Sequence, residues 1–313
     1  MIHFTSQTMQ EILDILSNKI SSIQPKETIE FQVINPDLYT SIYSGKKINL
    51  NDTIYTYRTY KAWFELAQLL KCSFLTPIIS QNSNFITLKY KKLNPDLSFH
   101  NKITQAEEKY GSNSIFGQIN KNEEPSFIYY YQQALKNITI SKRKSILNLG
   151  VNNGDEFEAI LNFYKNNDDI TFTGIDYCKS AIKDAKQKFK KFKNINFYQH
   201  DINYLETLEL KKYDLIITIG TLQSSNLEFN KLLMSIVQNQ LKKDGAIILG
   251  FPNCRWIDGE MIYGAKVKNY PFSEMGLLYK DVMFAKKYLQ QKKFRVTITG
   301  KEYIFLTATS IRK

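Results

Sequence analysis

Histidine and cysteine are both scarce: this chain of 313 residues has three of each. The cysteines form no C-x-x-C motif and no paired framework, which argues against structural zinc and favours a reducing compartment. The histidines lie far apart in the sequence, so none is a strong candidate for a general base. We therefore expect no metal site and place the protein in the cytoplasm.

Long apolar runs are absent as well. No stretch approaches the roughly 18 consecutive apolar residues of a membrane span, and acids interrupt the apolar residues at the start of the chain, unlike in a signal peptide. Hydrophobic residues still make up 43% of the chain, and its length suits about two domains with real cores. These features predict a globular protein outside the membrane and leave its oligomeric state open.

Charge is unevenly distributed. The formal net charge is +12, and residues 141–313 hold 28 basic and 18 acidic side chains. A basic field of this size suits a polyanion such as RNA. The alternative is that lysine is abundant throughout and that the lysines form solvated helix faces. Composition leaves both interpretations open.

One segment combines a strand, a glycine-bearing turn and the start of a helix. Residues 146–149 are apolar except for Asn148, Gly150 and Gly154 follow, and acids open the helix. A helix N-terminus favours an anion such as a pyrophosphate. Asp155 and Glu156 would repel that group, but they suit a ligand that carries an ammonium and a sulfonium. The dinucleotide fingerprint G-x-G-x-x-G also fails, because it would need glycine at positions 152 and 155.

The elements that follow alternate between strand and helix, as in a doubly wound parallel sheet. Strands are predicted at 170–176, 195–199, 213–220 and 244–251, with helices at 180–192 and 228–241. Segments 294–299 and 303–309 flank Gly300-Lys301 and predict an antiparallel hairpin. The fold class is therefore a Rossmann-like α/β sheet with an antiparallel C-terminal hairpin.

This order of elements and the turn resemble class I, Rossmann-like methyltransferases, which use S-adenosylmethionine. Their first motif is an acid, any residue, then Gly-x-Gly-x-Gly, which here falls on Asn148, Gly150, Asn152 and Gly154. Asn152 is a mild departure, because asparagine tolerates the left-handed backbone that such a turn needs. Asn148 lacks the charge that in the family helps orient the methionine end of the cofactor. Asp155 or Glu156 is the alternative source of that charge.

The resemblance covers residues 125–313 and assigns further roles. Asp176 ends the second predicted strand 22 positions after Gly154, a spacing that fits the carboxylate that binds ribose hydroxyls. Asp201 matches an acid that accepts a hydrogen bond from the adenine amino group in the family. The cofactor-binding residues implied are Asn148, Gly150, Asn152, Gly154, Asp155, Asp176, Asp201 and Gly220.

Residues 1–100 show a different pattern of apolar and polar residues, which predicts a small α+β domain. Helices are expected near 7–23 and 57–70, and strands near 30–34 and 84–91. The second helix carries an apolar stripe that includes Trp63. This stripe belongs either to a core, to a seam against the other domain, or to a substrate-recognition module.

Residues 101–124 are polar and glycine-bearing, and we interpret them as a linker or lid. Pro125 then opens a helix that precedes the first strand of the methyltransferase domain, 125–313. Class I methyltransferases usually carry a helix at this place. Its Tyr129–Tyr131 segment either lines the cofactor pocket or simply packs.

Candidate catalytic residues follow the fifth strand, because ligands of open α/β sheets lie outside the carboxyl ends of the strands. Asp258 and Glu260 are candidates for gripping or deprotonating a methyl acceptor, and Tyr263 for stacking on a planar one. The alternative is a solvated loop. Cys254 is expected to be a pocket-wall residue, because the cysteine motif of cytosine-5 RNA methyltransferases is missing after the fourth strand.

The sequence therefore predicts an S-adenosylmethionine-dependent methyltransferase. The acceptor is either RNA or a ribosome-linked group, or a small metabolite. The alternative is a binding protein that keeps the methyltransferase fold without catalysis, and a third candidate is a nucleotide-sugar or NAD enzyme.

Overall fold

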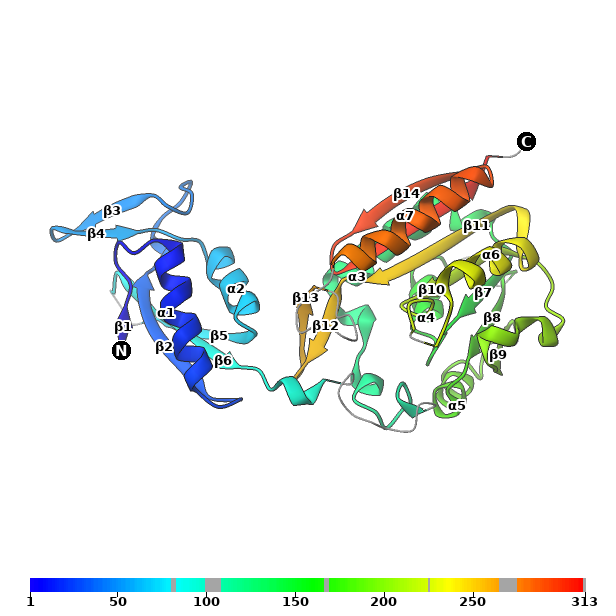
Figure 1. Cartoon of the computed structure of the whole chain (residues 1–313), viewed down its shortest axis with the longest axis horizontal. Helices are drawn as coiled ribbons and strands as arrows, with labels where there is room; N and C mark the ends of the chain where they lie inside the picture. Colours follow the sequence, from blue (N-terminus) through cyan, green and yellow to red (C-terminus); the bar gives the residue numbers. More distant parts are fainter. Residues whose placement is uncertain (80–82, 99–107, 166–168, 225, 265–274, 312–313) are drawn as a thin grey trace. The chain divides into compact units, whose positions relative to one another are not determined.

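The computed structural model describes residues 1–79, 83–98, 108–165, 169–224, 226–264 and 275–311. The chain forms two compact units, shown in Figure 1. The first unit comprises Met1–Ser98 and Trp256–Ile262, and the second comprises Phe99–Arg255 and Tyr263–Lys313. Segment 256–262 thus groups with the first unit, whereas the sequence analysis assigned it to the methyltransferase domain.

The first unit is built on a sheet with the strand order β1-β2-β6-β5. Its elements are β1 (Ile2–His3), α1 (Met9–Ser22), β2 (Thr28–Ile34), the hairpin β3 (Lys47–Leu50) and β4 (Thr53–Thr56), α2 (Tyr60–Leu69), β5 (Cys72–Ile79) and β6 (Phe85–Lys92). Helix α1 begins at a capping box, in which Thr8 and Glu11 satisfy each other's backbone N–H groups. The small α+β domain is confirmed.

The apolar stripe of α2 lies in the core of this unit. Trp63, Leu66 and Ala67 are buried and pack in one cluster with Phe31 and Tyr90 of the sheet. The Tyr90 hydroxyl donates to the Trp63 carbonyl oxygen at 2.5 Å. The core interpretation of the stripe is therefore confirmed.

The second unit contains a seven-stranded sheet in the order β14-β15-β11-β10-β7-β8-β9. Its strands are β7 (Ser145–Leu149), β8 (Thr171–Asp176), β9 (Ile195–Gln199), β10 (Tyr213–Ile219), β11 (Leu241–Pro252), β14 (Phe294–Gly300) and β15 (Tyr303–Ser310). Strands β7 to β11 pair in parallel, and β15 runs antiparallel to both β11 and β14. The predicted Rossmann-like sheet with an antiparallel terminal pair is confirmed.

Helices cover both faces of this sheet (Figure 1). They are α3 (Pro125–Asn137), α4 (Asp155–Phe163), α5 (Lys179–Lys188), α6 (Phe229–Asn239) and α7 (Met275–Gln291). On one face, α6 and α7 share a core with Leu149 and Leu306. On the other face, Phe127 of α3 packs on Phe305, and Phe157 of α4 packs on Phe172.

Several elements were not predicted from the sequence. No secondary structure was assigned to β3, β4, β5, α7 or the hairpin of β12 (Cys254–Ile257) and β13 (Glu260–Tyr263). For that hairpin, the alternative to a catalytic segment was a solvated loop. The helix predicted over 180–192 ends at Lys188. The five parallel strands agree with the predicted ranges to within three residues at each end.

The turn from β7 into α4 lies where the strand order reverses between β7 and β10. Gly150, Asn152 and Gly154 all have left-handed backbone, with φ of 74°, 47° and 89°. A Cβ atom at Gly150 would overlap the side chain of Thr221, which follows β10. Glycine is needed there both for its backbone conformation and for this close approach.

We expect Gly150→Ala to destabilise the protein by about 2–5 kcal/mol. The left-handed conformation costs an L residue about 1–2 kcal/mol, and overpacking adds about 1–3 kcal/mol. Gly259→Ala is the control, because Gly259 has φ of 84° and open space around its Cα atom. Denaturant unfolding of both variants measures the difference. Equal losses would show that Thr221 does not restrict position 150.

Asp214 fastens the beginning of β7 to the beginning of β10. Its Oδ2 atom accepts hydrogen bonds from the backbone N–H groups of Lys144 and Ser145 at 3.2 and 2.9 Å. Its Oδ1 atom accepts one from Lys242 Nζ at 2.9 Å. Burial raises the pKa of Asp214, but these hydrogen bonds outweigh it and hold the pKa below its ordinary value of 3.8.

A lowered folded-state pKa means that the Asp214 carboxylate stabilises the fold above pH 4 or so, and that this stability is lost as the pH falls through the folded-state value. We expect Asp214→Asn to cost about 2–3 kcal/mol at neutral pH. The deficit should shrink towards about pH 2. Urea unfolding at both pH values measures it, with exposed Asp184→Asn as the control. A deficit that is independent of pH would contradict this role.

Candidate cofactor-binding site

The loop between β7 and α4 is held against the end of β8. The N–H groups of Gly150 and Val151 both donate to the Ile175 carbonyl oxygen, at 2.8 and 3.1 Å. The Asn152 N–H donates to Asp176 Oδ2 at 2.8 Å, and the Cys178 N–H donates to Asp176 Oδ1 at 2.9 Å. The Asp176 carboxylate thus bridges the loops that follow two neighbouring strands.

Asp176 keeps capacity for a ligand. Each carboxylate oxygen has two lone pairs, and each accepts one of these backbone N–H groups. Burial raises the pKa of Asp176, while the N–H groups of Cys178 and Asn152 lower it by a smaller amount. Within the described part of the chain, one lone pair is left on each oxygen, which suits a vicinal diol.

A buried network lies at the end of β7. Asn148 is 1% exposed, and its Nδ2 atom donates to Glu156 Oε2 at 3.2 Å. Lys121 Nζ contacts the other carboxylate oxygen, Glu156 Oε1, at 2.7 Å. Asn148 Oδ1 is buried and has no hydrogen-bond partner among the described residues. Glu156 therefore brings a carboxylate to Asn148, where the family pattern has an acid.

Asp155, at the start of α4, is paired on another side. Lys188 Nζ lies 3.2 Å from Asp155 Oδ1 and 2.9 Å from Glu158 Oε2. Burial is the main cause that raises the pKa of Asp155, and Lys121 and Lys188 partly offset it. Lys188 is thus tied to carboxylates and differs from the solvated lysines expected on α5.

The described part of the predicted linker or lid, 108–124, contacts the loop. The Tyr110 carbonyl oxygen accepts from Asn152 Nδ2 at 2.7 Å, and Asn122 Nδ2 donates to the Asp155 carbonyl oxygen at 3.0 Å. Lys121 adds its ion pair with Glu156. The remainder, 101–107, lies outside the described residues. No pattern in the sequence predicted these contacts, because polar residues in a polar stretch resemble solvated ones.

Asp201 and Gly220 lie at the ends of neighbouring strands in the same sheet. Asp201 follows β9 and accepts the Asn203 N–H at 2.9 Å through its side chain. Gly220 follows β10 with φ of 73°, and its N–H donates to the Gly250 carbonyl oxygen at 2.9 Å. All eight residues predicted to bind the cofactor thus belong to the second unit and lie at or just after the carboxyl ends of β7, β8, β9 and β10.

The candidate catalytic residues belong to the β12–β13 hairpin. Asp258 and Gly259 form its turn, both with left-handed backbone. Asp258 Oδ2 accepts the Asn94 N–H at 3.0 Å, so this side chain has a structural task within the first unit. Glu260 is exposed and belongs to the same unit, whereas Tyr263, 48% exposed, belongs to the second. Their catalytic roles stay predictions.

Cys254 is buried, and burial raises the pKa of its thiol to about 12. That shift disfavours the thiolate that a nucleophile needs.

Within the described ranges, no group of three or more metal-ligating side chains is present. In those ranges, too, no helix is long and apolar enough to span a membrane.

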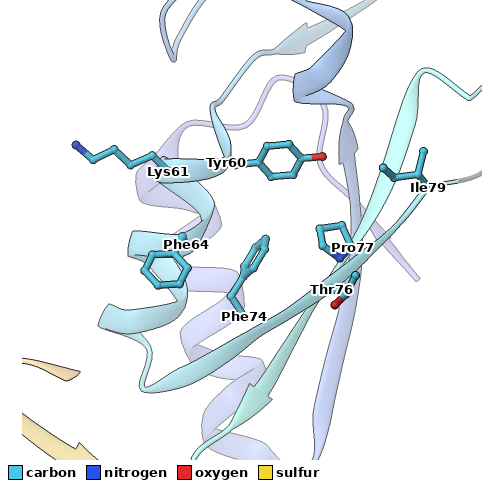
Figure 2. A pocket seen from close by; sticks show the side chains of 7 residues that line it. All are labelled: Tyr60, Lys61, Phe64, Phe74, Thr76, Pro77 and Ile79. Atoms are coloured by element: carbon cyan, nitrogen blue, oxygen red, sulfur yellow. The ribbon is translucent and has the colours of Figure 1, made fainter. Parts of the chain in front are cut away.

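The first unit carries an apolar pocket of about 480 Å³ between α2 and β5 (Figure 2). Its walls include the side chains of Tyr60, Phe64 and Phe74, with Lys61 beside them. The Tyr60 hydroxyl donates to Asp37 Oδ2 at 3.1 Å. Burial and Asp37 raise the pKa of Tyr60 to about 12, so the hydroxyl stays protonated.

The residues of the second unit fit a cofactor that carries a cation and a vicinal diol. Carboxylates of Asp155, Glu156 and Asp176 surround one loop, and Lys121 and Lys188 are the cations that contact the first two. Asn148 Oδ1 and Asn153 Oδ1 are buried acceptors with no partner within the described part of the chain. A ligand with donor groups would satisfy such acceptors.

Comparison with known proteins bears on the family of this chain. Residues 140–298 match a family model described as "Methyltransferase domain". A carboxy-S-adenosyl-L-methionine synthase from Helicobacter pylori is 26% identical over 157 residues. These cover 49% of this chain and 63% of the synthase, so the chain spans less than two thirds of that relative.

Two solved structures are similar to part of this chain. An N-methyltransferase, NodS from Bradyrhizobium japonicum in complex with S-adenosyl-L-homocysteine, has a TM-score of 0.42 at 16% identity and covers 61% of this chain and 90% of its own. A methyltransferase from Aquifex aeolicus has a TM-score of 0.42 at 16% identity, covering 62% of this chain and 98% of its own.

Because the family model matches half of the chain, the chain belongs to the methyltransferase domain family, and its second unit is a class I, S-adenosylmethionine-dependent methyltransferase domain, as the sequence predicted.

Proposed function

We propose that the whole chain is a cytoplasmic methyltransferase that transfers the methyl group of S-adenosylmethionine to an acceptor. The observation that carries this proposal is the Asp176 carboxylate, held by two backbone N–H groups at the end of β8 beside the left-handed β7–α4 loop. In open α/β sheets, this edge is where a nucleoside ligand lies.

Each cofactor-binding residue has a role in this proposal. Asp176 would accept hydrogen bonds from both ribose hydroxyls, and Asp201 from the adenine amino group. Gly150, Asn152 and Gly154 let the backbone approach the ligand closely, and Gly220 does the same after β10. Asn148 and Asp155 would face the methionine end.

Methyl transfer is an in-line displacement: the carbon–sulfur bond breaks, its electron pair stays on sulfur, and the acceptor atom bonds to the methyl carbon. Positioning the acceptor about 3 Å from the methyl group supplies much of the rate. An acceptor that carries a proton must lose it, and Asp258 and Glu260 are our candidates for this step. Tyr263 would stack on a planar acceptor.

The acceptor has two candidate classes, and one surface favours RNA. Lys179, Lys183, Lys186 and Lys190 recur at helical spacing along α5 and just beyond it, and all are exposed. We name these four residues the α5 lysine stripe. Such a stripe supplies the charge that a phosphate backbone requires. A small metabolite is the other class, and the aromatic pocket of the first unit supports substrate recognition there.

The similarity to the carboxy-S-adenosyl-L-methionine synthase does not imply that this chain catalyses the same reaction. The match is partial in both chains. What the two share under this proposal is an adenosyl sulfonium ligand. A binding protein without catalysis remains the alternative, and no comparison favours it over the methyltransferase.

We expect Asp176→Ala to weaken S-adenosylhomocysteine binding by about tenfold to a hundredfold. The lost hydrogen bonds are charge-assisted and worth roughly 1.5–3 kcal/mol. Titration calorimetry measures the affinity, with Asp184→Ala as the matched control. The melting temperature of each unliganded variant shows whether the loop survives the substitution. Equal affinities for wild type and Asp176→Ala would refute the ribose role.

If RNA is the acceptor, replacing the α5 lysine stripe with glutamine should reduce the salt dependence of RNA binding. Each phosphate contact in single-stranded RNA contributes about −0.7 to the slope of log K against log salt, so four lost contacts reduce the slope by about 3. Lys280, Lys286, Lys287 and Lys293, all changed to glutamine, remove the same charge elsewhere. Equal slopes for the two variants, or no RNA retention at about 0.1 M salt, would favour the metabolite.

A further inference from the structure

Lys121 is a buried cation at the candidate cofactor site. Its side chain is 10% exposed and that of its partner, Glu156, is 2% exposed, with 2.7 Å between Nζ and Oε1. Lysine is almost never buried in this way without a charged partner. The ammonium also lies 5.5 Å from the ring centre of Phe127, which excludes water on that side.

The surrounding charge explains why a cation is needed here. Burial lowers the pKa of Lys121, but Glu156, Asp155 and Asp176 together raise it by more, so the ammonium stays charged. Lys188 pairs with Asp155 from α5. Without Lys121, the hydrogen bond from the Asn148 amide would be the one interaction left to the buried Glu156 carboxylate among the described residues. An unpaired buried carboxylate is strongly unfavourable.

The pair leaves one acceptor unused. Asn148 Oδ1 is buried beside Glu156 and accepts no hydrogen bond from any residue that the structure describes. Lys121 therefore bonds to Glu156 but not to Asn148 Oδ1. An ammonium group has three donors, enough to bind Glu156 Oε1 and Asn148 Oδ1 together.

We propose that Glu156 and Asn148 form the binding position for the ammonium of the cofactor's methionine end, and that Lys121 fills this position until the cofactor enters. This inference rests on the proposed function. Glu156 then supplies, from α4, the charge that Asn148 lacks. Lys121 lies in the short 3₁₀ turn Lys121–Glu123, so its ammonium leaves when this turn or its side chain shifts.

The proposal predicts opposite effects for the two partners. Lys121→Met removes the competing cation and should strengthen S-adenosylhomocysteine binding by about tenfold. Glu156→Gln removes the charge that attracts the ammonium and should weaken binding by about tenfold or more. 5′-Methylthioadenosine lacks the amino-acid end, so its affinity should change by less than about twofold in both variants.

Titration calorimetry with both ligands tests these effects, with exposed Lys142→Met and Glu123→Gln as matched controls. Because removing one partner of a buried ion pair is strongly destabilising, the double variant Lys121→Met/Glu156→Gln is measured too. It carries no buried charge at this position. It should bind S-adenosylhomocysteine as weakly as Glu156→Gln does, and 5′-methylthioadenosine like wild type.

Three results would overturn the proposal. In the first, Lys121→Met weakens the binding of S-adenosylhomocysteine but leaves the affinity for 5′-methylthioadenosine unchanged, which would mean that Lys121 itself binds the cofactor's carboxylate. Parallel changes for both ligands would mean that the pair only supports the loop. Unchanged affinities in all variants would place the ammonium elsewhere. If wild type bound neither ligand, the proposed function itself would fail, which is a separate outcome.

Discussion

The bridge made by the Asp176 carboxylate is the interaction on which the site depends. A parallel sheet ends in separate loops, and nothing in the strand pairing itself fixes how those loops lie. Asp176 accepts one N–H from the loop after β7 and one from the loop after β8, and so sets their separation. Because both donors are backbone groups, the bridge constrains the path of the chain as well as its side chains.

The bridge places a third carboxylate near two others, and neighbouring lysines reduce the resulting repulsion. A carboxylate that must stay partly buried beside Asp155 and Glu156 concentrates negative charge at one loop. Two lysines from different segments pair with these acids. Lys121, which precedes α3, pairs with Glu156, and Lys188, on α5, pairs with Asp155. Both Asp155 and Glu156 are therefore paired, and these two lysines are still outnumbered by the carboxylates of Asp155, Glu156 and Asp176.

Sequence predicted the sheet well because parallel strands are buried on both faces and therefore form near-continuous apolar runs, as in β10. It predicted less where the signal is short or ambiguous. Strand β5 contains Pro77 at a shift in register, which resembles a break in the sequence. The hairpin β3–β4 turns at Asn51 and Asp52, both left-handed without any glycine, and so lacks the usual hairpin signal.

The residues of the site divide in the same way. Asp176 and the loop glycines follow their strands directly, so spacing along the chain locates them. Lys121 reaches Glu156 across 35 positions, and no periodicity reports such a contact. Asp258-Gly259 did carry a hairpin signal, but its charged and aromatic neighbours favoured a functional interpretation over a turn. The Asp258 carboxylate accepts the backbone N–H of Asn94, so a structural role accounts for one polar residue of this segment, and its catalytic role stays a prediction.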